Sequence, residues 1–116
     1  MREITCSTIT DAIKKMCIEA ATILPQDVEK ALSQKHDEED SALAKKTLQV
    51  LMDNAKLAQE KQMPICQDTG MAFVYVTMGQ EVHITGGSLN EAIQEGVRQG
   101  YTEGYLRKSV VKDPLF

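Results

Sequence analysis

The heptapeptide PICQDTG, residues Pro64–Gly70, lies where a helical first half of the chain ends and an apolar run begins. It places a thiol, an amide, a carboxylate and a hydroxyl at consecutive positions between a proline and a glycine. Loops held between regular elements commonly display binding and catalytic groups. We therefore read the rest of the chain as the scaffold that presents this loop.

The first helix is predicted from Thr8, because Thr8 and Asp11 have the spacing of a capping box. The apolar residues that follow recur at intervals of four and three, which predicts an amphipathic helix of about four turns. Cys17 adjoins the buried stripe and is expected to pack as a small apolar side chain. The stripe consists of Ile9, Ile13, Met16, Ala20 and Ile23.

Two further helices are predicted before the heptapeptide. Pro25 suits the first turn of one helix, and the polar run Ser33–Asp40 is expected to end it. His36 lies in this run beside several acids, which leaves a metal site as the alternative to a solvated connection. Apolar spacing predicts the other helix over Ser41–Gln62, and Pro64 then prevents its continuation.

The second half of the chain combines strands and a helix. The β-branched and aromatic run Met71–Met78 predicts a strand buried on both faces. Glu81–Thr85 alternates as a half-exposed strand does, with His83 at a solvent-facing position. Ser88 and Glu91 form a second capping box, which predicts a helix to about Tyr105.

This last helix carries Gly96, Gly100 and Gly104 on one stripe. Each glycine costs roughly 1 kcal/mol of helix propensity relative to alanine. The spacing therefore predicts that another backbone or a ligand-bearing loop approaches this stripe closely. Together, the patterns predict an α+β fold in which about four helices pack with a small mixed sheet, as a single domain over 1–116.

Composition narrows the classes of function. The chain has 116 residues, of which 42% are hydrophobic, as is typical of a globular protein. Its net charge of −4 does not indicate a surface that binds nucleic acid. No apolar run approaches the roughly 20 residues of a membrane-spanning helix. The three cysteines form no even disulfide framework. We expect reduced thiols, a cytoplasmic location, and no membrane or nucleic-acid partner.

The chemistry of the heptapeptide leaves three interpretations open. Cys66 offers a thiolate to zinc, copper(I) or an iron–sulfur cluster, with the other ligands coming from elsewhere. Asp68, Thr69 and Gly70 match the aspartic-protease triplet, although that architecture is nearly all β. Alternatively, an Asx-type hydrogen bond from Asp68 and the flexibility of Gly70 build a tight turn and nothing more.

A resemblance favours the first interpretation. PICQDTG, together with GYLRKSVV at Gly104–Val111 and DPL at Asp113–Leu115, resembles the class I iron–sulfur fumarate hydratases. It also resembles the α subunit of L(+)-tartrate dehydratase. The resemblance covers nearly the whole chain, and the motifs occur in the expected order. It implies a hydro-lyase that adds water to, or removes it from, a four-carbon dicarboxylate, with fumarate and malate as the first choice and tartrate as the second.

The resemblance also assigns roles to residues. In that family three cysteines hold a 4Fe–4S cluster and leave one iron open, and Cys66 would be the first of these ligands. Gln67 and Asp68 would contact the substrate, and Asp68 would also protonate the leaving hydroxyl. Arg107 would bind a substrate carboxylate, because its planar, permanently charged guanidinium group can donate two parallel hydrogen bonds to the two carboxylate oxygens. Without the resemblance, Arg107 is interpreted as an arginine at the end of a helix, where its positive charge interacts favourably with the helix dipole.

The departures from the family pattern are as informative. The other two cluster cysteines would lie beyond Phe116, and Cys6 and Cys17 do not match them. The chain is thus expected to be the N-terminal portion of the α region of a larger hydro-lyase, inactive alone. Its partners would be the remaining α region and a β subunit or C-terminal domain, in a homo- or hetero-oligomer. The alternative is a non-catalytic assembly or binding module that retains the fold.

Overall fold

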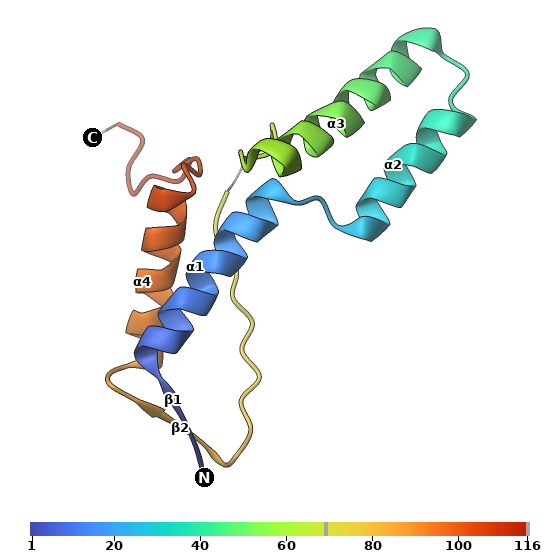
Figure 1. Ribbon diagram of the computed structural model, residues 1–116. Helices are drawn as coiled ribbons and strands as arrows, with labels where there is room; N and C mark the ends of the chain where they lie inside the picture. The colour runs from blue at the N-terminus through green and yellow to red at the C-terminus, as the bar shows by residue number, and fades with distance from the viewer. Residues whose placement is uncertain (69, 116) are drawn as a thin grey trace. The chain divides into compact units, whose positions relative to one another are not determined.

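The computed structural model describes residues 1–68 and 70–115, and these fall into two compact units. Unit 1 comprises Met1–Glu19 and the described residues from Asp68 onward, and unit 2 comprises Ala20–Gln67. Figure 1 colours the chain from end to end. The described residues form a mixed α+β structure, as predicted, and the single domain over 1–116 stays a prediction.

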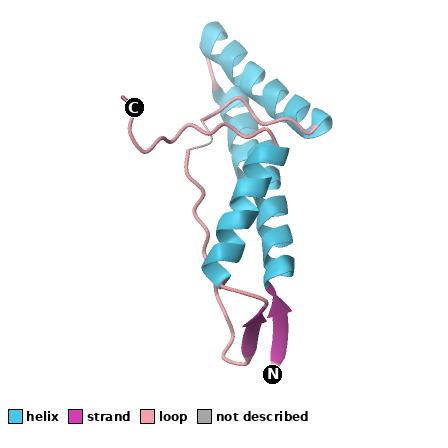
Figure 2. Ribbon diagram, turned by 90° about the vertical axis from the view of Figure 1, so that its left-hand side faces the viewer, coloured by secondary structure: helices cyan, strands magenta, loops and turns pink. Residues whose placement is uncertain are grey.

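Unit 1 contains a two-stranded parallel sheet formed by β1 (Arg2–Thr5) and β2 (Val82–Thr85). The two strands lie side by side and point the same way in Figure 2. Ile4 pairs with Ile84 in the register, and both are partly buried, whereas His83 is exposed as predicted. β2 confirms the predicted strand. Among the described residues the sheet is a parallel pair of strands, and not the mixed sheet that was expected.

Helix α1 (Cys6–Thr22) begins earlier than predicted, because its cap is Thr5 and not Thr8. The Thr8 N–H donates to Thr5 Oγ1 at 3.2 Å, which satisfies one of the free N–H groups of the first turn. Of the predicted apolar stripe, Ile13 is buried, whereas Met16 is 52% exposed. The buried face of α1 within unit 1 is therefore narrower than the sequence pattern indicates.

Helix α4 (Leu89–Glu103) packs against α1 through its glycines, as predicted. A Cβ at Gly96 would lie 2.6 Å from Ile13 Cβ, and one at Gly100 would lie 2.8 Å from Cys17 Cβ. Such distances leave no room for a side chain, so the two helices meet closely (Figures 1 and 2). Thr10 Oγ1 also donates to Ala92 O at 3.0 Å across this contact.

Two further features of α4 are an ion pair to α1 and the structure of its N-cap. Lys14 Nζ lies 3.2 Å from Glu103 Oε2, so an ion pair joins α1 to the end of α4. Ser88 occupies the N-cap position with extended backbone, but its side chain makes no capping hydrogen bond. The predicted helix start is therefore right, and the predicted capping-box bond is wrong.

The prediction of a buried strand at Met71–Met78 is wrong. No residue of this segment belongs to a strand, and all eight are exposed. The sequence has the composition of a buried strand, but among the described residues no strand pairs with it, and the other residues of unit 1 cover it too little to bury it. The remaining chain after α4, from Gly104 to Leu115, forms no helix or strand.

Unit 2 is built on two helices, α2 (Gln26–Glu38) and α3 (Ala42–Lys61). α3 confirms the predicted helix: Ser41 Oγ accepts from the Ala44 N–H at 3.4 Å, and Ala55 and Ala58 are buried. Pro25 is the residue before α2, as its sequence position suggests. No helix among the described residues is long and apolar enough to cross a membrane.

α2 ends within the polar run Ser33–Asp40, as expected, but the interpretation of this run as a connection is wrong for most of its length, because the helix continues to Glu38. Glu38 accepts hydrogen bonds from Gln34 Nε2 and Lys35 Nζ, both at 2.7 Å, which supports the last turn. The hydrogen bond from Lys35 holds the pKa of the Glu38 carboxyl below its usual value. His36 Nδ1 lies 3.3 Å from Asp37 Oδ1.

Candidate functional site

The backbone of the heptapeptide is tied to the helices of unit 2 on either side of its thiol. The Ile65 N–H donates to Ala21 O at 2.8 Å, and the Cys66 N–H donates to Asn54 Oδ1 at 2.9 Å. Just before the loop, the Met63 N–H donates to Ala58 O at 3.0 Å. These bonds fix the main chain at Cys66 to the last turn of α1 and to α3.

The fixed backbone presents an exposed thiol. Cys66 is exposed, whereas Cys6 and Cys17 are partly buried. Burial raises the pKa of the Cys17 thiol, and the Cys17 Cβ lies against Gly100, so Cys17 packs as predicted for a small apolar side chain. Cys6 Sγ donates to Ser88 O at 3.7 Å. Of the three thiols, Cys66 is the one open to an external ligand.

The residues after Cys66 make a tight turn. The Gly70 N–H donates to Asp68 Oδ1 at 3.3 Å, and Gly70 has a φ of +57°, a conformation that glycine adopts without strain. This is the Asx-type bond that the turn interpretation predicted. Gln67 and Asp68 are both exposed, and Thr69 lies outside the described residues.

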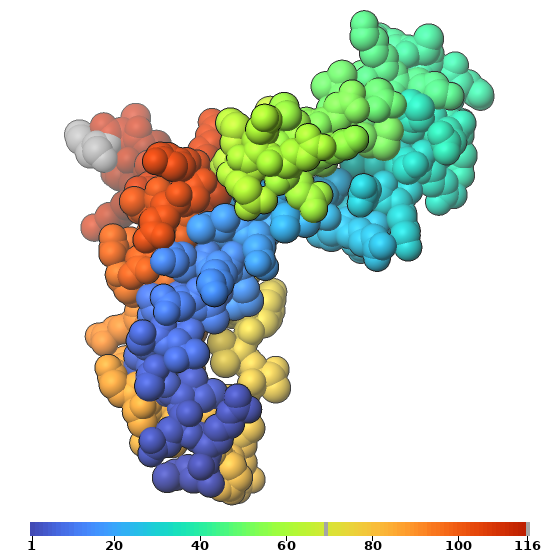
Figure 3. Space-filling model, in the orientation of Figure 1, coloured from blue at the N-terminus to red at the C-terminus, as the bar shows by residue number. Residues whose placement is uncertain are grey.

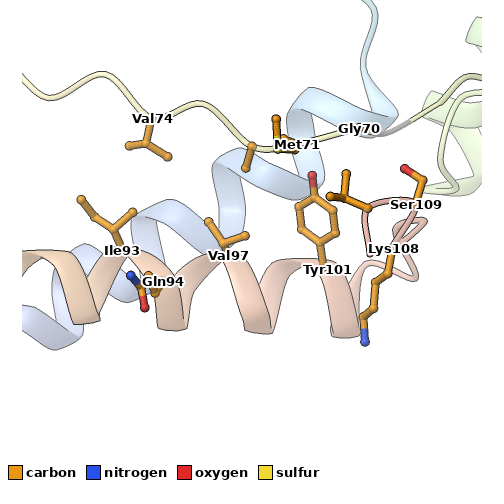
Figure 4. A pocket seen from close by; sticks show the side chains of 11 residues that line it. Gly70, Met71, Val74, Ile93, Gln94, Val97, Tyr101, Lys108 and Ser109 are labelled. Carbon is orange, nitrogen blue, oxygen red and sulfur yellow. The ribbon is translucent and has the colours of Figure 1, made fainter. Parts of the chain in front are cut away.

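Arg107 follows α4 in unit 1 and is exposed. No ion pair involves its guanidinium within the described part of the chain. Its neighbours Lys108 and Ser109 line a hollow of about 480 Å³ together with Gly70 and Tyr101. In Figure 4 the side chain of Tyr101 rises from α4 towards the chain near Gly70. The structure thus brings the end of the heptapeptide, Gly70, and the two residues after Arg107 to one hollow, which Arg107 itself does not line.

The predicted site residues are divided between the two units. Cys66 and Gln67 end unit 2, and Asp68 and Arg107 belong to unit 1. Within 1–68 and 70–115, no group of three or more His, Cys, Asp or Glu side chains could hold a metal ion. Among the described residues, the thiol of Cys66 therefore belongs to no group of three or more such ligands.

Asn54 was missed by the sequence analysis. It lies on α3 three residues after Leu51 and four before Ala58, so it shares the apolar face that faces the loop. A partly buried amide on such a face requires a hydrogen-bond partner. The position of this one polar residue among apolar ones was the signal available in the sequence.

The comparisons with known proteins agree with the motifs. A family model described as fumarate hydratase (Fumerase) matches residues 10–116. The chain belongs to the fumarate hydratase family. The match begins within α1 and includes the heptapeptide, α4 and the segment that carries Arg107.

Individual relatives within this family carry two kinds of name. A putative L(+)-tartrate dehydratase subunit alpha of Methanocaldococcus jannaschii is 38% identical over 104 residues, which are 89% of this chain and 36% of the relative. A putative fumarate hydratase class I of Geobacillus stearothermophilus is 31% identical over 102 residues, 87% of this chain and 20% of the relative. The L(+)-tartrate dehydratase subunit alpha of Escherichia coli is 27% identical over 104 residues, 90% of this chain and 34% of the relative. The chain thus spans well under half the length of these members of the fumarate hydratase family.

Proposed function

We propose that this chain is the N-terminal portion of an iron–sulfur hydro-lyase that adds water to, or removes it from, a four-carbon dicarboxylate. Fumarate and malate are the first-choice substrates. The observation that carries the proposal is the exposed Cys66 thiol on a backbone that Asn54 and Ala21 fix from both sides. Membership in the fumarate hydratase family, over residues 10–116, supports the reaction class.

The residues present fit one position of a 4Fe–4S cluster. A cluster ligand must reach its iron as a thiolate, and Cys66 is exposed and free of a packing role. The partly buried Cys6 and Cys17 do not suit this task. We therefore assign one ligand to this chain and the others to the remaining polypeptide. When bound, the cluster would supply an open iron that polarises the substrate hydroxyl as a Lewis acid.

The other proposed roles belong to Gln67, Asp68 and Arg107. All three side chains are exposed, as residues that contact an external substrate must be. The Arg107 guanidinium would bind a substrate carboxylate through paired hydrogen bonds, and the Gln67 amide would donate to a substrate oxygen. The Asp68 carboxyl would pass a proton to the departing hydroxyl and take one back in the reverse reaction.

A tartrate dehydratase is the second candidate. Two of the relatives are named as α subunits of that enzyme, and one of these is 38% identical to the chain. Such names imply a β subunit as partner, so we include both the remaining α region and a β subunit among the proposed partners. The two substrates share the carboxylates that Arg107 and Gln67 would bind, so the present residues favour neither.

The test combines this chain anaerobically with the rest of the α region, the β subunit, iron and sulfide. We would follow loss of water from malate and from L-tartrate side by side. Faster turnover of malate supports the first choice, and faster turnover of tartrate supports the second. If the complex forms and neither substrate reacts, the chain is an assembly module that has kept the fold without the activity.

A further inference from the structure

The extended segment Met71–Met78 leaves a long apolar surface uncovered on unit 1. All eight residues are exposed, with Phe73 at 74% and Tyr75 at 93%. In Figure 3 the segment is the yellow stretch beside the blue residues of β1 and α1. Contiguous apolar surface of this kind on a globular protein marks an interaction site.

The two sides of the segment are exposed to different degrees. In an extended chain, alternate side chains point in opposite directions. Phe73 and Tyr75 lie on one side, and Val76 and Met78, with 53% and 54% exposure, lie on the other. Val76 and Met78 line a hollow with other apolar residues of unit 1, so their side is partly covered. The side of Phe73 and Tyr75 lacks a covering layer among the described residues.

The backbone of the segment also lacks partners. Within the described part of the chain, no backbone–backbone hydrogen bond involves residues 71–78. Extended backbone with unpaired N–H and C=O groups is a template for another strand. The residue types are those that fit a pleated, half-buried surface.

The sequence around the segment carries none of the usual protection of an exposed edge. No charged residue and no proline occurs between Asp68 and Glu81. Exposed edge strands in natural proteins are commonly guarded by lysine, proline or a bulge. An uncharged run of twelve residues, 69–80, is therefore suited to an apolar covering surface and not to water.

Hollows lie beside the segment on the inner side of unit 1. The hollow of about 480 Å³ in Figure 4 lies between Met71, Val74 and the Val97 side chain of α4. A second hollow, of about 190 Å³, lies beside Val76 and is lined by Ile84 of β2 and by other apolar residues. Both hollows are open to solvent and lined mainly by apolar side chains, so they suit the apolar side chains of a covering element.

We propose that Met71–Met78 is a β-strand of the assembled enzyme and that the rest of the α subunit completes it by strand addition. The identity of this partner rests on the proposed function. The matched residues are only 36% of the M. jannaschii α subunit, so such a relative holds the equivalent segment in a much longer chain.

A second copy of this chain fits the surface less well. Its identical strand would pair with one edge of Met71–Met78 and leave the other edge and at least one side exposed. It would also bring its own unfilled hollows of about 480 and 190 Å³. Covering both edges and the side of Phe73 and Tyr75, and filling the hollows on the other side, requires a partner with several elements. The larger part of the α subunit can supply them.

The test measures amide exchange of this chain alone and mixed with the C-terminal part of the M. jannaschii α subunit, beyond the matched region. The amides of residues 72–78 should exchange freely in the chain alone and slow by at least about 100-fold in the complex. Tyr75→Lys should weaken binding by at least about tenfold, whereas Tyr75→Phe should bind normally. Tyr105→Lys is the matched control, since Tyr105 is 88% exposed in unit 1, and it should also bind normally.

Three results would overturn the proposal. A complex in which residues 72–78 remain unprotected would place the interface elsewhere. Self-association that protects them, without binding of the added polypeptide, would assign the surface to a second copy. Absence of any association would remove the interface altogether. Neither readout needs iron, sulfide or turnover, so these results are separate from failure of the hydro-lyase proposal, which substrate turnover decides.

Discussion

The Asn54 side chain accepts a hydrogen bond from the backbone N–H of Cys66, with 2.9 Å between Oδ1 and N. Asn54 belongs to α3, so a regular element holds the main chain of the candidate ligand while the thiol stays exposed. A ligand on a fixed backbone loses less conformational freedom on binding than one on a mobile loop. This relationship connects the helical half of the chain to its proposed chemistry.

Asn54→Ala should loosen the loop at Cys66. The substitution removes the acceptor of the Cys66 N–H, and a hydrogen bond of this kind contributes about 1 kcal/mol to the free energy of unfolding. The exchange rate of the Cys66 amide, measured by NMR, should rise more than that of amides in α4. Asn54→Asp retains an acceptor and should preserve protection, and Asn90→Ala on the exposed face of α4 should change nothing. Unchanged Cys66 exchange in Asn54→Ala would show that the bond does not hold the loop.

Gly96→Ala should destabilise the contact between α1 and α4. The new Cβ would lie 2.6 Å from Ile13 Cβ and 2.8 Å from Thr10 O, so one helix must move. Overpacking typically costs about 1–3 kcal/mol, and a gain in helix propensity of roughly 1 kcal/mol offsets part of it. Urea unfolding should therefore show a net loss of stability. Gln94→Ala, at an exposed position of the same helix, should lie within about 0.5 kcal/mol of the parent. A Gly96→Ala chain as stable as the parent would refute the close contact.

The Glu95 carboxylate should titrate at unusually low pH. Arg98 Nε donates to Glu95 Oε2 and Gln99 Nε2 donates to Oε1, both at 2.7 Å, and these bonds lower the pKa of Glu95 from 4.5 to about 2. A lowered folded-state pKa adds stability above the unfolded-state value, and this stability is lost as pH falls from about 4.5 towards 2. Carbon-detected NMR titration should find the low pKa, and Arg98→Met should raise it towards 4.5. Lys15→Met on α1 serves as the control and should leave the low pKa of Glu95 unchanged. A normal Glu95 pKa in the parent chain would contradict the pairing.

In the assembled enzyme, Asp68→Asn and Arg107→Met should affect turnover differently. Loss of the Asp68 proton donor should lower kcat by about 10²–10⁴-fold. Loss of the charge-assisted bonds of Arg107 should raise KM, because about 1.5–3 kcal/mol of binding is removed. Lys112→Met, a loss of positive charge in the same C-terminal segment, should leave both constants near the parent values. Normal kcat in Asp68→Asn, with iron content unchanged, would end the proton-donor proposal.

Sequence periodicity predicted the helices because their apolar residues recur at helical spacing and their caps are local. The short β1 was missed, since Arg2–Thr5 contains one apolar residue and its pairing with β2 depends on residues some 80 positions away. The strand prediction for Met71–Met78 failed for a related reason. The β-branched and aromatic residues show that the segment suits a buried strand, but whether it is buried depends on which other residues pack against it. By contrast, the glycines at positions 96, 100 and 104, two of them in α4 and one at its C-cap, correctly indicated a close approach of another element, because close packing explains why a helix would carry such unfavourable residues.

Only those features of the candidate site that depend on neighbouring residues in the sequence were predictable. The heptapeptide indicated a displayed thiol and an Asx turn, and the structure contains both an exposed Cys66 and the bond from Gly70 to Asp68. The support from Asn54 was not predictable from motif spacing, because it depends on how α3 meets the loop. Roles for Gln67 and Arg107 came from resemblance and stay predictions.

Whether Cys66 is a cluster ligand is decided by the visible absorption spectrum of the complex reconstituted anaerobically with iron and sulfide, with each cysteine of this chain changed in turn. We expect a brown complex for the parent, Cys6→Ala and Cys17→Ala, and a colourless or rapidly bleaching one for Cys66→Ala, with association retained in all four. A Cys66→Ala complex with the same spectrum and iron content as the parent would contradict this expectation, because the exposed thiol of the heptapeptide would then not be a cluster ligand.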